Sequence, residues 1–194
     1  MSDYTVIRAV SEGLRNILVA HMDAYFASVS VDLRSPREMG APDANMRISL
    51  WLYRVTRNEF VNNDPPVRPA FNEVRRWPVP VNLYYLVTPI QQEPTTRQEL
   101  LGAVLQTFHD HSSLFGSDLG TPPPLGDQPI RVTLDSLRLD ELTQVWYALQ
   151  ESYQLSASYL VQFARIDSAH EPVEVEPVRE RHSDYDQILK VPVP

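Results

Sequence analysis

Several residue types that carry chemistry, or that would place a chain in a membrane, are missing from these 194 residues. There is no cysteine, which excludes disulfides and thiolate nucleophiles. Lys190 is the single lysine and follows no glycine-rich loop, so the phosphate-binding motif of nucleotide hydrolases is absent. No apolar run approaches the roughly 20 residues that span a bilayer, and residues 1–13 lack the apolar stretch of an export signal. We therefore expect assembly in the cytoplasm and no insertion into a membrane.

The charge balance argues against a nucleic-acid partner. The net charge is −8, whereas nucleic-acid binding depends mainly on cationic side chains that neutralise phosphates. All but one of the 17 cationic residues are Arg, and the planar guanidinium is favoured at protein interfaces because it makes several directed contacts. The alternative explanation is a compositional bias of the genome, which also fits the 17 prolines.

The clearest pattern is strand, helix, strand between residues 130 and 168. Residues 130–134 read as a short strand, and Asp140 is the expected cap of a helix whose apolar face follows the i, i+3, i+4, i+7 spacing. That face consists of Leu142, Val145, Trp146 and Leu149. Residues 157–166 are apolar on both sides, which predicts a strand in the middle of a sheet. One side carries Tyr159, Val161 and Phe163, and the other carries Leu160, Ala164 and Ile166.

The rest of the chain adds two helices and three strands. Helices are expected at residues 3–20 and 94–108, the second with Thr96 and Glu99 at capping-box spacing. Strands are expected at residues 25–32, 47–55 and 79–88. In the second of these strands Ile48, Leu50 and Leu52 share one face, opposite Trp51, Tyr53 and Val55. The fold class is therefore α/β (α+β), with a mixed, mostly central β-sheet of about five strands flanked by about three helices.

The composition changes after Ser168. Residues 169–194 are acidic and rich in proline and contain no glycine, which is typical of an extended arm outside a core. We predict one domain over residues 1–168 and an extended C-terminal arm over residues 169–194.

No catalytic constellation is present in the sequence. There is no nucleophile elbow and no zinc-binding pattern. His109 and His111 are the best candidates for metal ligands, but they end a predicted helix, where polar groups suit the negative helix terminus. The aromatic residues follow the faces of predicted elements, so core packing is favoured over a ligand pocket; they are Trp51, Tyr53, Tyr84, Tyr85 and Trp146. We predict a protein that is not an enzyme and has no cofactor, metal site or catalytic residue.

Five blocks of sequence follow one another in a recognisable order. They are residues 52–58, the pairs at 62–63 and 65–66, residues 83–88, residues 100–104, and the helix and strand that end at Ser168. Together they resemble the cap, or tail-terminator, proteins of contractile injection systems of the antifeeding-prophage and virulence-cassette type. The resemblance implies a phage tail-terminator-like fold and a structural role.

The resemblance further implies a homo-hexameric ring at the end of the inner tube that is distal to the baseplate. Such a ring stops polymerisation of tube and sheath and anchors the last sheath ring, so the implied partners are the inner-tube protein and the sheath protein of a particle that is either released or retained by the cell. A closed ring needs two different complementary faces on each subunit. The candidate interface residues lie in a long loop and are Arg57, Asn58, Asn62, Asn63, Arg68, Arg75 and Arg76. The proline-rich loop at residues 121–126 is a further candidate, and an ordinary exposed loop is the alternative for both.

The C-terminal arm supports a second hypothesis. Val173 and Val175 alternate with glutamates between two prolines, a pattern that allows a short strand to join the edge of a neighbour's sheet. We expect the arm to reach an adjacent cap subunit or the sheath, with a disordered tail as the alternative.

Two other classes of function remain open from the sequence. One is a small protein- or ligand-binding module of the same fold that acts outside an injection particle. The other is an enzyme whose site is assembled only in three dimensions, which requires a pocket with convergent titratable groups.

Overall fold

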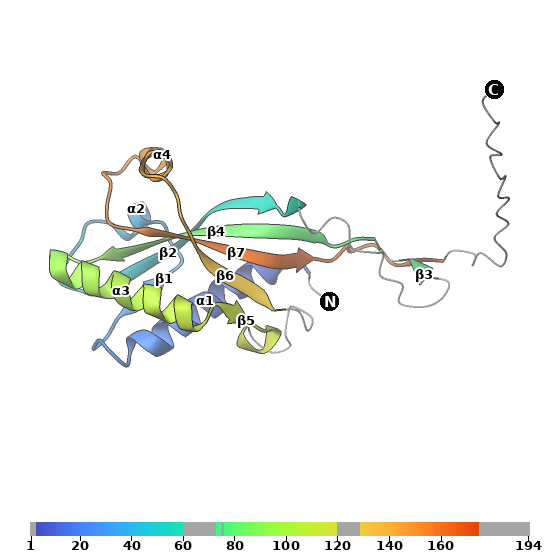
Figure 1. Cartoon of the computed structure of the whole chain (residues 1–194), viewed down its shortest axis with the longest axis horizontal. Coiled ribbons are helices and arrows are strands. Elements are labelled where there is room, and N and C mark those ends of the chain that lie inside the picture. Colours follow the sequence, from blue (N-terminus) through green and yellow to red (C-terminus); the bar gives the residue numbers. More distant parts are fainter. Residues whose placement is uncertain (1–2, 60–72, 75, 120–128, 175–194) are drawn as a thin grey trace, which may run out of the picture.

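The computed structural model describes residues 3–59, 73–74, 76–119 and 129–174 (Figure 1). The helices are α1 (Val6–Met22), α2 (Pro36–Met39), α3 (Pro94–Asp110), α4 (Leu139–Leu149) and the 3-10 helix η2 (Gly116–Leu119). The strands are β1 (Ser30–Asp32), β2 (Arg47–Arg57), β3 (Glu73–Val74), β4 (Val79–Ile90), β5 (Ser113–Leu114), β6 (Ile130–Asp135), β7 (Ala157–Ile166) and β8 (Val173–Glu174).

The described strands form one large sheet and one small one. The large sheet has six strands in the order β1-β2-β4-β7-β6-β5, and β3 pairs with β8 in a separate two-stranded ribbon. All neighbours in the large sheet are antiparallel except β1 and β2, which are parallel. The predicted α+β class with a mixed sheet is confirmed. Strands β2 and β7 lie in the interior of the sheet, as their two-sided apolar patterns predicted.

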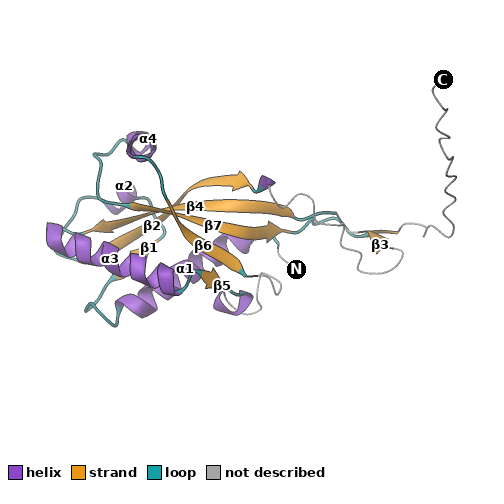
Figure 2. Ribbon diagram, in the orientation of Figure 1, coloured by secondary structure: helices purple, strands orange, loops and turns teal. Residues whose placement is uncertain are grey.

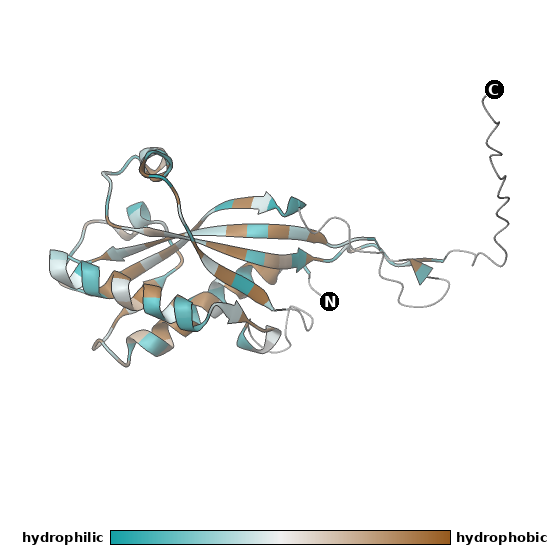
Figure 3. Cartoon of the chain, viewed as in Figure 1, coloured by the Kyte–Doolittle hydropathy of each residue, from teal (hydrophilic) through white to brown (hydrophobic). Residues whose placement is uncertain are grey.

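Most of the core lies between α1, α3 and one face of the large sheet (Figures 1 and 2). Figure 3 shows the polar and apolar bands that alternate along β4, whose core-facing side carries Leu83, Tyr85 and Val87. The hydroxyl of the fully buried Tyr85 lies 2.8 Å from Ser11 Oγ of α1. Burial raises the pKa of Tyr85 to about 12, because the phenolate would be desolvated in the core.

A second, smaller apolar cluster fixes α4 to the opposite face of the sheet. Its buried members are Leu86, Leu142, Trp146 and Leu149. The predicted face of this helix is therefore confirmed, with Val145 only half-buried at its edge. Arg37 of α2 fastens the C-terminal end of α4, since its Nη1 donates to Leu149 O at 3.3 Å and to Gln150 Oε1 at 2.9 Å.

Two β-bulges move side chains to faces that strict alternation does not predict. Tyr53 is the additional residue of β2 where the register shifts between Leu52 and Arg54, so Val55 pairs with Leu83 on the α1 side of the sheet. Phe163, at φ 70°, lies in the shift of β7, so Ala164 joins Val161 in the main core. The predicted faces of Val55, Ala164 and Ile166 were therefore wrong.

Three further details of the sequence reading were wrong at element ends. The strand expected at residues 25–32 is present only as Ser30–Asp32, because Phe26 N still donates to Met22 O and prolongs the turn after α1. Helix α3 begins after Glu93, so Thr96 lies inside the helix and forms no cap. Helix α4 begins after Arg138. The capping hydrogen bond at its N-terminus is made by Glu141, whose Oε2 accepts from Arg138 N at 2.9 Å. Asp140 lies in the first turn and pairs with Arg138 at 3.4 Å.

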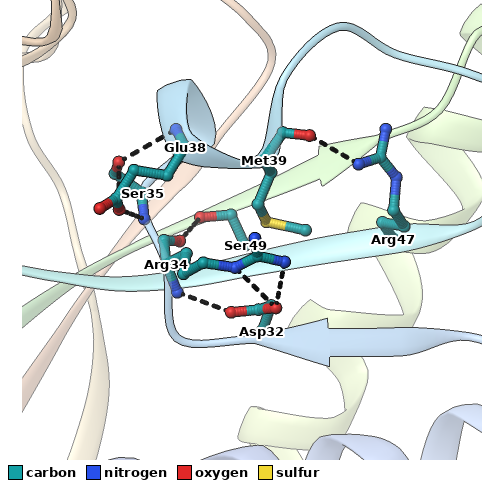
Figure 4. Close-up of polar contacts among 7 residues, drawn as sticks. All are labelled: Asp32, Arg34, Ser35, Glu38, Met39, Arg47 and Ser49. Atoms are coloured by element: carbon teal, nitrogen blue, oxygen red, sulfur yellow. Dashed lines mark hydrogen bonds and ion pairs between the residues drawn. The ribbon is translucent and has the colours of Figure 1, made fainter.

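The connection between β1 and β2 contains α2 and is held in place by polar contacts (Figure 4). Ser35 and Glu38 form a capping box at the start of α2. Two hydrogen bonds from the Arg34 guanidinium reach Asp32 Oδ2 and hold the pKa of Asp32 below its usual value. Ser49 Oγ of β2 donates to Arg34 O at 2.6 Å, which fastens this connection to the sheet.

Candidate assembly interface

Three of the predicted interface residues lie at one end of the large sheet, where β2 ends and β4 begins. Arg57 is the last residue of β2 and is exposed, and Arg76 is exposed shortly before β4. Asn58 differs, because it is only 2% exposed. Its backbone N–H donates to Pro80 O at 2.9 Å and its Nδ2 donates to Asn82 Oδ1 at 3.1 Å. These two bonds hold the end of β2 against the start of β4. Asn58 therefore positions the strand end, whereas the two arginines face outward.

The ribbon of β3 and β8 joins the two segments that the sequence nominated separately. Glu73 pairs with Glu174 and Val74 pairs with Val173, so a piece of the long loop lies beside a piece of the C-terminal arm. The ribbon projects beyond the end of the large sheet (Figure 1), and Val173 is 59% exposed. The other nominated residues lie outside the described ranges; they are Asn62, Asn63, Arg68, Arg75 and Val175, together with the loop at residues 121–126.

Exposed apolar side chains accompany the arginines at this end of the sheet. Val55 is 46% exposed, Trp77 40% and Val79 49%. The bulge at Tyr53 turns Val55 to the face that also carries Val79, and along the rest of the sheet that face is covered by α1 and α3. None of these three residues was among the predicted interface residues. Val79 begins the apolar alternation over residues 79–87, and its place at the start of the strand is the signal that could have found it.

A groove of about 400 Å³ lies on the other face of the sheet, between α4 and β2. Its half-buried lining is apolar and aromatic and consists of Trp51, Tyr53, Leu137 and Val145. Exposed polar residues line it as well, namely Arg54, Glu141 and Gln144, and Ala148 completes the lining. The Arg54 guanidinium carbon lies 5.0 Å from the centre of the Tyr84 ring, a cation–π contact that holds the side chain above the sheet.

The histidines nominated as metal ligands occupy the end of α3. His109 lies in its last turn, and the His111 ring packs edge-on against His21 of α1 with ring centres 4.3 Å apart. Within the described ranges, no group of three or more His, Asp or Glu side chains could hold a metal ion. In the same ranges, no helix combines the length and hydropathy needed to cross a membrane.

One known protein family matches most of the chain. The family model described as the Pvc16 N-terminal domain matches residues 9–180. This chain belongs to the Pvc16 N-terminal domain family. Among curated protein sequences, none matches it.

Two solved structures have a fold similar to that of this chain. One is the sheath/tube terminator of PVC, an extracellular contractile injection system, in its extended state. It has a TM-score of 0.63 and 17% identity, over 99% of this chain and 67% of that one. The other is the tube-terminating cap of the anti-feeding prophage, with a TM-score of 0.62 and 18% identity, over 91% of this chain and 60% of that one. The resemblance to tail terminators that the sequence blocks indicated is confirmed at the level of family and fold.

Proposed function

We propose that this Pvc16 N-terminal domain protein is the cap of a contractile injection particle and forms a homo-hexameric ring that ends the inner tube and anchors the last sheath ring. The observation that carries the proposal is its likeness over 99% of its length to a sheath/tube terminator. The chain acts by covering the terminal contacts of a polymer, with no bond-making chemistry. Its partners are further copies of itself, the tube protein and the sheath protein, and the particle assembles in the cytoplasm.

Two regions of the molecule present different kinds of side chains, and a closed ring requires two different complementary faces on each subunit. The sheet end presents Arg57 and Arg76 beside exposed apolar side chains. Helix α4 contains no basic residue and carries Asp140 and Glu141 in its first turn. Its Tyr147 side chain is 85% exposed. Charge complementarity of this kind fixes the register of an interface and suppresses wrong pairings. We assign the sheet end and the α4 side as the two faces that meet around the ring.

The β3–β8 ribbon supplies a backbone contribution to the same assembly. Each of its strands has two residues, and an isolated two-stranded pair is at best marginally stable in water. The edges of a short ribbon of this kind can pair with a strand of an adjacent cap subunit or of the sheath. We propose that the arm acts through this ribbon.

The experiment that tests ring formation replaces the exposed arginines. Full-length chains with Arg57→Glu and Arg76→Glu are compared with wild type by multi-angle light scattering, alone and with purified tube ends. We expect wild type to reach the mass of a hexamer of 22.2 kDa chains. The double variant should need at least about a tenfold higher protein concentration to form the ring.

The matched control is Arg97→Glu, at the start of α3 near the opposite end of the sheet. It should assemble as wild type does. A wild-type chain that stays monomeric with and without tube ends would contradict the ring. It would favour the alternative of a small binding module.

A further inference from the structure

The groove between α4 and β2 has the composition of a site for an extended peptide. Its half-buried lining is apolar, with Trp51, Tyr53 and Val145, and a few exposed polar residues accompany them. Binding grooves typically combine such an apolar surface with a small number of polar groups that fix orientation. Aromatic grooves in particular accept extended segments that contain proline.

Polar groups of the groove are positioned to orient an incoming chain. No hydrogen bond among the described residues uses the Trp51 indole N–H, so it can donate to a backbone carbonyl of a bound segment. Arg54 and Glu141 line the same groove with opposite charges. A fitting segment therefore carries apolar residues together with one acidic and one basic residue.

One stretch of this sequence has that composition. Residues 184–193, which follow the described part of the arm, read Asp-Tyr-Asp-Gln-Ile-Leu-Lys-Val-Pro-Val. Ile188 and Val191 supply the apolar side chains, Asp186 suits Arg54, and Lys190, the only lysine of the chain, suits Glu141.

We propose that residues 184–193 of one copy bind in the α4–β2 groove of a neighbouring copy. This rests on the ring assigned above, in which the sheet end of one copy meets the α4 side of the next. The path from Leu86, beside the groove, along β4 to Val79, across to Ile166 and on to Glu174 spans about 50 Å of extended chain. From Glu174 to Ile188 the chain reaches at most about 50 Å, so to reach its own groove it would have to be almost fully extended. The groove of a neighbour seated against the ribbon is within easier reach.

Single-cysteine variants report this contact directly because the chain has no cysteine of its own. One full-length chain carries Gln144→Cys in the groove, and a second full-length chain carries Val191→Cys. The two are mixed at a concentration that supports assembly and oxidised gently. The matched control replaces the first chain by one with Gln106→Cys, since Gln106 is also an exposed glutamine but lies on α3, which covers the other face of the sheet.

We expect the Gln144 pair to form a disulfide-linked dimer at least about tenfold faster than the Gln106 pair, since docking raises the local thiol concentration. Adding Ile188→Asp to the Val191→Cys chain should reduce that rate to the control value. Equal rates for the two pairs would overturn the proposal. A further chain carries both Gln144→Cys and Val191→Cys, and a disulfide that forms only within this chain, and not between chains, would also overturn it.

Light scattering on the same samples separates this proposal from the proposed function. A hexamer without preferential cross-linking would contradict the docking of residues 184–193 and leave the proposed ring standing. Monomers under all conditions, with or without tube ends, would contradict both the docking and the ring.

Discussion

Replacing Trp146 by Ala tests how strongly the small apolar cluster holds α4 on the sheet. Trp146 is 1% exposed and packs among Leu86, Leu142 and Leu149. Its Nε1 also donates to Ser156 Oγ at 3.2 Å. Truncation of a buried Trp costs about 3–5 kcal/mol, because the transfer free energy is lost and a cavity remains. We expect the free energy of unfolding to fall by about 4 kcal/mol, which corresponds to a decrease of about 8–16 °C in Tm for a chain of this size.

The location of the loss is as informative as its size. Because the cluster under α4 is separate from the core under α1 and α3, amide hydrogen exchange should accelerate in residues 137–156 while α1 stays protected. The control is Tyr147→Ala on the same helix, where the side chain is 85% exposed and the change should stay within about 0.5 kcal/mol. A loss below about 1 kcal/mol for Trp146→Ala, or equal acceleration in α1 and α4, would refute this account of the packing.

Two further predictions concern single side chains. Tyr85→Phe should cost about 1 kcal/mol at neutral pH, since Ser11 Oγ keeps its bond to Ile7 O at 2.9 Å. Because folding raises the pKa of Tyr85 to about 12 from about 10, the tyrosine's contribution is complete below pH 10 and is lost as the pH rises to 12. Wild type should therefore lose about 2 kcal/mol between pH 8 and 11.5 that Tyr85→Phe retains, measured by urea denaturation at both pH values, and parallel pH profiles would contradict this. Arg37→Ala should cost about 1–2 kcal/mol and accelerate exchange at the C-terminal end of α4, whereas unchanged exchange there would show that its bonds to Leu149 and Gln150 contribute little.

The sequence predicted the long elements well because their patterns are periodic and their burial is simple. The α4 face with Leu142, Trp146 and Leu149 and the interior position of β7 followed from spacing alone. The errors arose where local geometry interrupts the period. A single additional residue at Tyr53 or at Phe163 inverts every later side chain of the strand, and no residue type in those stretches signals it.

Gly13 illustrates a residue whose role needs the fold. In sequence it weakens the first predicted helix. In the structure it lies inside α1 and is buried against Leu119 of η2, where an added Cβ would collide with the leucine side chain. A close approach between segments so far apart in the chain cannot be read from either segment alone.

The candidate interface was predicted in part. The sequence nominated the long loop and the arm for separate reasons, and the structure pairs Glu73–Val74 with Val173–Glu174. Val55 and Trp77 could not be predicted from the sequence as interface residues, because their exposure depends on where α1 and α3 stop covering the sheet. The groove residues Trp51 and Tyr53 were assigned to the core, and they are only half-buried.

The most direct test of the proposed cap is the length of the inner tube in particles assembled without this chain. Particles from cells with and without its gene are compared by negative-stain electron microscopy, with the wild-type gene restored as the control. The account predicts tubes of variable length with an open, irregular end distal to the baseplate, corrected by the restored gene. Tubes of unchanged length with an orderly distal end would contradict it.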